Sequence, residues 1–217
     1  MMSLPVFKSK KRLRVLCLGA HCDDIEIGCG ATLLKLIEEN PPASVTWVVF
    51  SSDEVRELEA RNSAKFILGD SVSSELMILN HHNGYFPYVG AEIKDDFEQL
   101  KNKIEPDIIF THYGKDHHQD HRVVSELTWN TFRNHWILEY EIPKYDGGLG
   151  SPNLFAPVQA KYVRRKSEIL MDCYESQVNR PWFSRSTFDA LMRLRGIECN
   201  SKSGYAEAFY VRKTIIE

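Results

Sequence analysis

Short runs of apolar residues alternate along the chain with longer stretches in which apolar residues recur every three or four positions. The short runs are typical of buried strands and cover 14–18, 45–50, 75–79, 107–111 and 206–212. The longer stretches predict amphipathic helices over 29–39, 54–68, 93–104, 122–134 and 162–174. Because strands and helices follow one another in turn, the pattern predicts an α/β fold, a Rossmann-like and mostly parallel sheet with helices on both faces.

Residues 140–160 interrupt this alternation. They contain Pro143, Pro152 and Pro157 together with several glycines, yet apolar residues are interspersed, so we expect a long ordered loop or a hairpin. On the second helix, the residues expected to face the core are Val55, Leu58, Phe66 and Leu68. Neither a repeat nor a low-complexity tract divides the chain, so we expect a single domain over 1–217 in which 1–11 form a flexible arm.

The composition is that of an ordinary globular protein, with 43% hydrophobic and 26% charged residues. The 27 basic and 30 acidic residues nearly cancel to a net charge of −3, which argues against nucleic acid as a partner. No apolar run approaches the roughly 20 residues of a membrane span, and 1–11 lack the apolar core of a signal peptide. The five cysteines form no CxxC pair, so we expect a reduced, cytoplasmic compartment.

The first group of candidate functional residues lies in a polar turn after the first predicted strand. In open α/β sheets, ligands bind at the carboxyl ends of the strands. The three-residue spacing of His21 and Asp24 can bring an imidazole nitrogen and a carboxylate oxygen onto one metal ion, leaving Asp23 free beside it. Alternatively, the two aspartates only cap the next helix. A dinucleotide site is disfavoured, because the third glycine of a GxGxxG motif starting at Gly28 would fall at Leu33.

The second group follows the fourth predicted strand, where 111–122 hold four of the eight histidines. Its candidate residues are His112, Asp116, His117, His118, Asp120 and His121. Solvated loops favour glycine, serine, asparagine and lysine over imidazole, whereas histidine is a common zinc ligand and acid/base group. Both groups lie at the carboxyl ends of parallel strands, so we expect them to converge in one crevice. Two ligands from the first and one from the second leave a position for water, as in catalytic zinc sites.

These two segments, in this order, resemble the LmbE/PIG-L family of zinc-dependent de-N-acetylases. That family carries an AHPDD-type motif and later an HxDH motif, which stand here as Ala20-His21-Cys22-Asp23-Asp24 and His118-Gln119-Asp120-His121. The resemblance extends over roughly residues 12–213. Cys22 and Gln119 replace the family's prolines, and neither of these positions carries chemistry.

The resemblance implies one zinc ion per chain, bound by His21, Asp24 and His121. It also implies that Asp23 is the general base, that His118 stabilises the oxyanion or protonates the leaving amine, and that Asp120 supports them. The residues expected to contact substrate are Arg56, with Arg61 in reserve, and Tyr145, Asp146, Gln177 and Glu207.

The function that the resemblance implies is removal of an N-acetyl group from a small molecule that contains an amino sugar, an N-acetylated sugar or glycoside. Because family members often assemble, a homo-oligomer is a further expectation. Two alternatives stay open. A metal-dependent phosphoesterase would need His112, Asp116 and His117 as additional ligands. A non-catalytic metal- or sugar-binding protein would have no use for the base, Asp23.

Overall fold

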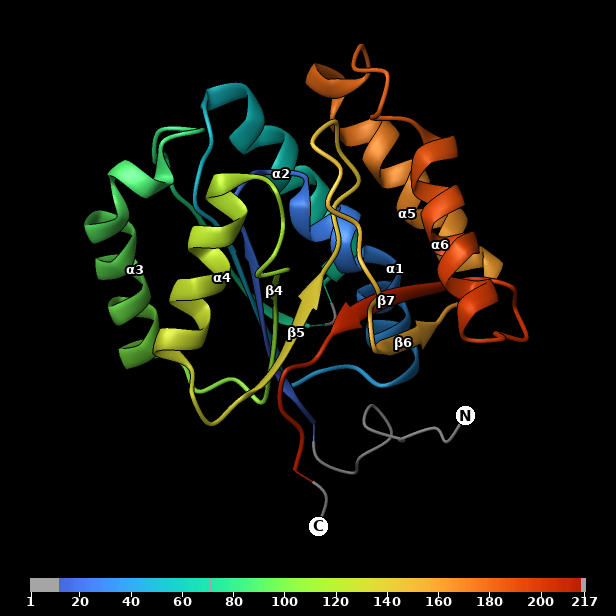
Figure 1. The fold of residues 1–217 in the computed structure, drawn as a ribbon, viewed down its shortest axis with the longest axis horizontal. Helices are drawn as coiled ribbons and strands as arrows, with labels where there is room; N and C mark the ends of the chain where they lie inside the picture. Colours follow the sequence, from blue (N-terminus) through green and yellow to red (C-terminus); the bar gives the residue numbers. More distant parts are fainter. Residues whose placement is uncertain (1–11, 71, 216–217) are drawn as a thin grey trace.

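Seven strands form one sheet within residues 12–70 and 72–215, the part of the chain that this computed structural model describes. They are β1 (Arg14–Gly19), β2 (Ser44–Val49), β3 (Ser73–Ile78), β4 (Ile108–His112), β5 (Trp136–Tyr140), β6 (Leu154–Pro157) and β7 (Ala206–Tyr210). Their order across the sheet is β3-β2-β1-β4-β5-β7-β6 (Figure 1). The pairs from β3 to β5 are parallel, whereas β7 is antiparallel to both of its neighbours. The predicted mostly parallel sheet is confirmed, and the arm predicted at 1–11 lies outside the described residues.

Helices cover both faces of this sheet. They are α1 (Asp24–Glu39), α2 (Glu54–Leu68), α3 (Gly90–Lys103), α4 (Gln119–Thr131), α5 (Ala160–Cys173) and α6 (Arg185–Glu198), with short 3-10 turns η2 (Phe86–Tyr88) and η3 (Glu175–Gln177). Helices α3 and α4 pack together on one face, and α1, α2, α5 and α6 form the layer on the other (Figure 1). Within the described ranges, no helix combines the length and the apolar character needed to cross a membrane.

The central strands are apolar on both sides because each side meets a helical layer. In β1, Val15 and Cys17 belong to the core cluster under α1, α2 and α5, whereas Leu16 and Leu18 belong to the cluster under α3 and α4. This alternation is the period of two that a strand imposes on its side chains. It explains why the central strands appear in the sequence as unbroken apolar runs.

The apolar pattern of the chain did not predict β5 or α6, and β6 lies within the expected loop or hairpin. Strand β5 was hidden because the buried Glu139 interrupts its apolar run. Helix α6 has a weak apolar face: Phe188 and Met192 are buried, but Leu194 and Ile197 are exposed. A short apolar run broken by a charge, and a helix with apolar residues on two sides, give no clear period.

Two expectations about the helices were also wrong in detail. Helix α1 begins at Asp24, not at residue 29, because Gly28 is used for close packing and does not break the helix. On α2, Leu68 is buried as expected, but Val55, Leu58 and Phe66 are exposed. The inner face of α2 is made largely of small residues, which a search for large apolar side chains does not detect; they are Ala60, Ser63 and Ala64.

Candidate metal centre

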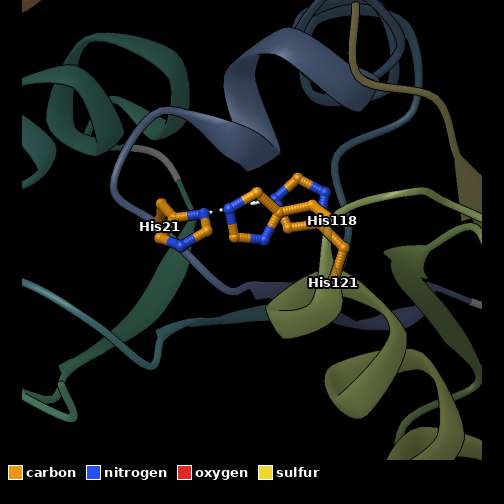
Figure 2. Close-up of side chains that lie close together, drawn as sticks. All are labelled: His21, His118 and His121. Carbon is orange, nitrogen blue, oxygen red and sulfur yellow. Dashed lines mark hydrogen bonds between the residues drawn. The ribbon is translucent and has the colours of Figure 1, made fainter. Parts of the chain in front are cut away.

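The two histidine- and aspartate-bearing segments meet at the carboxyl ends of β1 and β4, which are neighbours in the sheet. From β1 the chain crosses to β2 on one side, and it enters β4 on the other, so this is the switch point where open α/β sheets bind ligands. His21 follows β1 and Asp24 begins α1, whereas His118 and His121 stand at the start of α4. Figure 2 shows the three imidazoles converging from these elements.

Two imidazole nitrogens and both carboxylate oxygens of Asp24 lie close together in this group. His21 Nδ1 is 3.2 Å from His121 Nε2 and 3.3 Å from Asp24 Oδ2, and Asp24 Oδ1 is 3.5 Å from His121 Nε2. The buried carboxylate of Asp24 also accepts the backbone N–H of His21 at 2.6 Å, which fixes its direction. The structure therefore brings together the three residues that the resemblance implies as zinc ligands.

Each of the two histidines is backed by a buried aspartate. Asp120 Oδ2 lies 3.3 Å from His21 Nε2, and Asp116 Oδ2 lies 3.1 Å from His121 Nδ1. The hydrogen bond from Asp120 holds a proton on His21 Nε2 and leaves Nδ1 to bind a metal, whereas Asp116 contacts His121 Nδ1 at an ion-pair distance without the geometry of a hydrogen bond. The rings are thus oriented so that His21 Nδ1 and His121 Nε2 face each other.

His118 is the N-cap residue of α4, where its Nδ1 accepts the backbone N–H of Asp120 at 3.2 Å. This contact leaves the proton of the neutral ring on Nε2. One ring nitrogen from each of His21, His118 and His121 lies within 4.8 Å of the other two. Burial, together with the nearby charge of His21, lowers the pKa of His118. The ring therefore presents an N–H donor to the site.

His112 also belongs to this cluster; it was among the candidate residues of the second group, but a ligand role was expected for it only in the phosphoesterase alternative. It ends β4, is fully buried, and stacks on the His121 ring at a centroid distance of 3.9 Å. Its Nε2 accepts the backbone N–H of Ala20 at 2.9 Å and lies 3.2 Å from Asp24 Oδ2. Because this lone pair is engaged, we interpret His112 as a wall of the site and not as a metal ligand.

Burial and mutual contacts set the charges of the cluster. Burial lowers the pKa of His121 to about 3, so its ring is neutral, the state that binds metals. Burial alone would raise the pKa of Asp24, but the surrounding imidazoles, of which His21 is protonated, hold it well below its ordinary value. Burial also opposes protonation of His21, yet Asp24 and Asp120 raise its pKa to about 10, so metal binding at its Nδ1 must release a proton.

Asp23, the expected general base, is buried beside this cluster and is paired with Arg56. An Arg56 Nη nitrogen donates to Asp23 Oδ1 at 2.8 Å, and Arg56 Nε lies 3.7 Å from Glu59. Burial alone would lower the pKa of Arg56, but the charge of Asp23 raises it above its ordinary value. The predicted substrate residue Arg56 therefore lies next to the expected base.

The reserve arginine, Arg61, lies elsewhere. It is exposed on the outer surface of α2, where it pairs with Glu57, so the structure does not bring it to the site. Gln177 is buried in η3 and donates to the Ser176 hydroxyl at 2.9 Å. Ser176 in turn donates to Glu59 at 2.7 Å, so Gln177 lies behind Arg56 and not among the histidines.

The loop between β5 and β6 folds back onto the second histidine segment. His117 Nδ1 is 2.8 Å from the backbone oxygen of Asp146, and Lys144 Nζ is 2.6 Å from Asp116 Oδ2. Tyr145 is 72% exposed at the tip of this turn. The loop is thus docked on the segment 116–118, and substrate contacts of Tyr145 and Asp146 stay a prediction. The role of Lys144 had no signal in the sequence, because its partner is 28 positions away.

Glu207, expected to bind substrate, is instead buried against the middle of α1, about two helical turns beyond Asp24. Its carboxylate accepts the backbone N–H groups of Ala31 and Thr32 at 3.0 and 2.7 Å and pairs with Lys166 at 2.7 Å. These contacts occupy both oxygens and leave none for a substrate. Glu207 therefore braces α1 against β7 and α5.

Cys22 stands in the first motif where the family has proline. The thiol is buried, and it donates to the backbone oxygen of Ser51 at 3.5 Å. Burial raises its pKa well above the usual value, so it remains a protonated thiol. We interpret it as a packing residue of the turn.

The chain resembles known proteins in both sequence and fold. The model of the PIG-L family, described as GlcNAc-PI de-N-acetylase, matches residues 16–132. The uncharacterized deacetylase YaiS of Escherichia coli K12 is 31% identical over 172 residues, which cover 73% of this chain and 89% of that protein.

Two solved structures share the fold at low sequence identity. The N,N'-diacetylchitobiose deacetylase of Pyrococcus horikoshii superimposes with a TM-score of 0.69 at 18% identity, covering 93% of this chain and 84% of that one. The 4-carboxy-2-hydroxymuconate hydratase GalB of Pseudomonas putida KT2440 has a TM-score of 0.72 at 13% identity, covering 94% and 98%. Since one neighbour is a deacetylase and the other a hydratase, this fold alone does not specify the reaction.

Proposed function

Because this chain belongs to the PIG-L family of de-N-acetylases and is a hydrolase of that type, we propose that it uses one zinc ion to remove the N-acetyl group from a small molecule that contains an amino sugar. The observation that carries the proposal is the close approach of His21, Asp24 and His121: the two imidazole nitrogens are 3.2 Å apart, and each lies near a different oxygen of Asp24, at 3.3 and 3.5 Å. Asp23, the adjacent carboxylate, is kept apart from these three side chains by its pairing with Arg56.

The donor set fits zinc. Zinc binds nitrogen and oxygen at about 2.0–2.1 Å in a tetrahedron, whose ligand atoms are then about 3.3 Å apart, close to the 3.2 Å between His21 Nδ1 and His121 Nε2 and to the 3.3 Å between His21 Nδ1 and Asp24 Oδ2. Three protein ligands from His21, Asp24 and His121 would leave the fourth position open, as in catalytic zinc sites. When bound, zinc supplies Lewis acidity that lowers the pKa of water toward ~7 and polarises the acyl oxygen.

Asp23 acts as the general base in this proposal. Its carboxylate takes a proton from the attacking water, whose oxygen then adds to the amide carbon. Arg56 holds the carboxylate at 2.8 Å and so fixes the direction of its free oxygen. The C–N bond breaks as the amide nitrogen takes up a proton, and the products are acetate and a free amine.

His118 meets the negative charge that develops on the acyl oxygen. The N-cap contact on Nδ1 directs its Nε2–H as a donor, and removing such a donor costs about 2.7–4 kcal/mol of transition-state stabilisation. Asp120 does not reach the substrate in this scheme. It holds His21 through Nε2 and is itself held by the backbone N–H groups of Gly84 and Phe86, at 2.6 and 3.2 Å.

Substrate contacts are proposed for Arg56, which pairs with Asp23, and for Tyr145 and Asp146, whose loop contacts the segment 116–118. A phenol and a carboxylate that are adjacent in the sequence suit the hydroxyl groups of an N-acetylated sugar or glycoside. Gln177 supports Arg56 through Ser176 and Glu59. Assembly of the chain into a homo-oligomer stays a prediction.

The test is to measure zinc content and amide hydrolysis on the same preparation. N-acetylglucosamine and N,N'-diacetylchitobiose are supplied as substrates, acetate release is measured with and without a chelator, and a panel of phosphodiesters is assayed beside them. We expect about one zinc per chain and acetate release that the chelator abolishes. Phosphodiester cleavage without acetate release would identify a phosphoesterase, and sugar binding without either activity would identify a binding protein.

A further inference from the structure

The two aspartates that orient the metal-facing histidines are themselves held in different ways. Asp120, behind His21, accepts two backbone N–H groups, which no side-chain change can remove. Asp116, behind His121, accepts one backbone N–H from His118 at 2.8 Å and is otherwise paired with the side chain of Lys144. The orientation of His121 therefore depends on a side chain from a distant loop.

Lys144 and Asp116 form a pair that is almost excluded from water. The side chains are 10% and 3% exposed, and Lys144 Nζ also donates to the backbone oxygen of Ile142 at 2.8 Å. Burial alone would raise the pKa of Asp116, but the contacts with His121 and Lys144 hold it far below its ordinary value. Removal of one partner from such a pair leaves the other charge buried and uncompensated, which is strongly unfavourable.

The same oxygen atom serves both neighbours of Asp116. Oδ2 lies 2.6 Å from Lys144 Nζ and 3.1 Å from His121 Nδ1. Lys144 thereby fixes the position of the oxygen that faces the imidazole. If the ammonium group were removed, the carboxylate would turn toward water or toward other donors, and the His121 ring would lose its restraint.

The Lys144–Asp116 pair also attaches the loop between β5 and β6 to the segment 116–118. His117 Nδ1 bonds to the backbone oxygen of Asp146 on the other side of Tyr145, so the turn 144–147 is attached at two points. Arg122 donates to the backbone oxygens of Asp116 and His117 at 2.9 and 2.7 Å and holds the opposite partner in place. The turn and the segment 116–118 thus form one docked unit.

We propose that Lys144 is a positioning residue that couples the loop carrying Tyr145 and Asp146 to the metal centre. Its ammonium group affects the zinc affinity of the site through Asp116 and His121, although two residues separate it from the ion that they would bind. This inference rests on the proposed metal site. Since binding linkage is reciprocal, a ligand that orders the loop also tightens the hold on the metal.

The experiment measures the zinc affinity of the chelator-stripped full chain by competition with a chromophoric chelator. Lys144→Met keeps the length of the side chain and removes its charge, and we expect the dissociation constant for zinc to rise tenfold or more, the effect typical of residues that support metal ligands. Lys144→Arg keeps the charge and should restore most of the affinity. The control is Lys115→Met, which removes the same charge from an exposed position beside Asp116 and should leave the affinity unchanged.

Asp116→Asn completes a cycle that distinguishes positioning from a general loss of structure. If Lys144 acts through Asp116, the double variant should bind zinc no more weakly than Asp116→Asn alone. Additive losses would overturn the proposal, as would equal losses in Lys144→Met and Lys115→Met. All titrations are made well below the unfolding temperature of each metal-free variant, followed by circular dichroism.

Two further outcomes separate this inference from the proposed function. A wild-type protein that binds no zinc would overturn both. A wild-type protein that binds zinc and releases acetate, together with an unchanged zinc affinity in Lys144→Met, would overturn only the coupling.

Discussion

Gly28→Ala and Gly30→Ala make the same change two residues apart in α1, and we expect opposite effects on stability. A Cβ on Gly28 would lie 2.8 Å from Tyr140 Cε2 and closer still to two other atoms of that ring. A Cβ on Gly30 would meet its nearest neighbour, Lys166, at 3.6 Å, an ordinary van der Waals distance. Neither glycine has a positive φ, so only the space beside each one differs.

The Tyr140 ring has little freedom to move away. It is fully buried, and its hydroxyl donates to the backbone oxygen of Leu18 at 2.6 Å. The hydroxyl oxygen of Tyr140 also lies 3.2 Å from His112 Nε2. Overpacking of this kind costs about 1–3 kcal/mol, and three close ring atoms favour the upper end. Alanine in a helix interior stabilises the folded state by about 1 kcal/mol relative to glycine, which offsets part of this loss. We therefore expect Gly28→Ala to lose about 2 kcal/mol, and Gly30→Ala to gain up to about 1 kcal/mol.

The assay is thermal unfolding of the two variants and the wild type under one set of conditions. For a chain of this size, 1 kcal/mol corresponds to about 2–4 °C in Tm, so the two variants should differ by about 6–12 °C. Zinc affinity should fall in Gly28→Ala, because Tyr140 contacts His112 beside Asp24. Equal Tm values, or a Gly28→Ala protein as stable as the wild type, would refute the packing of α1 on Tyr140.

Three other substitutions test the assignments within and beneath the site. Asp23→Asn should keep about one zinc per chain and lose nearly all turnover, and loss of the metal would instead make Asp23 a ligand. His121→Ala should lose the metal while the exposed His82→Ala keeps it, and full zinc content in His121→Ala would remove it from the ligand set. Glu207→Ala leaves Lys166 buried without its partner and should lower the unfolding free energy by about 3–5 kcal/mol in urea titrations, whereas unchanged stability would contradict its bracing role.

The part of the site that the sequence predicts well is the part whose members are close in the chain. His21 and Asp24 are three residues apart, and so are His118 and His121, and each pair follows an apolar strand whose direction the strand–helix alternation predicts. The parallel sheet then brings the two pairs to one edge. The substrate-binding role predicted for Glu207 was wrong, because its position in the sequence of β7 shows neither that its side chain faces α1 nor that it pairs with Lys166 there.

The strand that the sequence did not reveal is the one that supplies the supports of the site. Tyr140 ends β5 and contacts His112, and Lys144 follows β5 and contacts Asp116. This region carries Glu139 and Glu141, which are buried, and two buried carboxylates beside a short apolar run are normally incompatible with a central strand. Here both are compensated by arginines from far along the chain: Arg212 lies 2.5 Å from Glu139, and Arg195 binds Glu141 through two nitrogens at 2.6 and 2.8 Å. A buried charge is tolerated in a strand only when a partner compensates it. Because these partners are 54 or more positions away, no local sequence pattern indicates that the carboxylates are compensated. The ligands of the candidate metal centre could therefore be found from motifs, whereas the residues that hold those ligands in place required the tertiary structure.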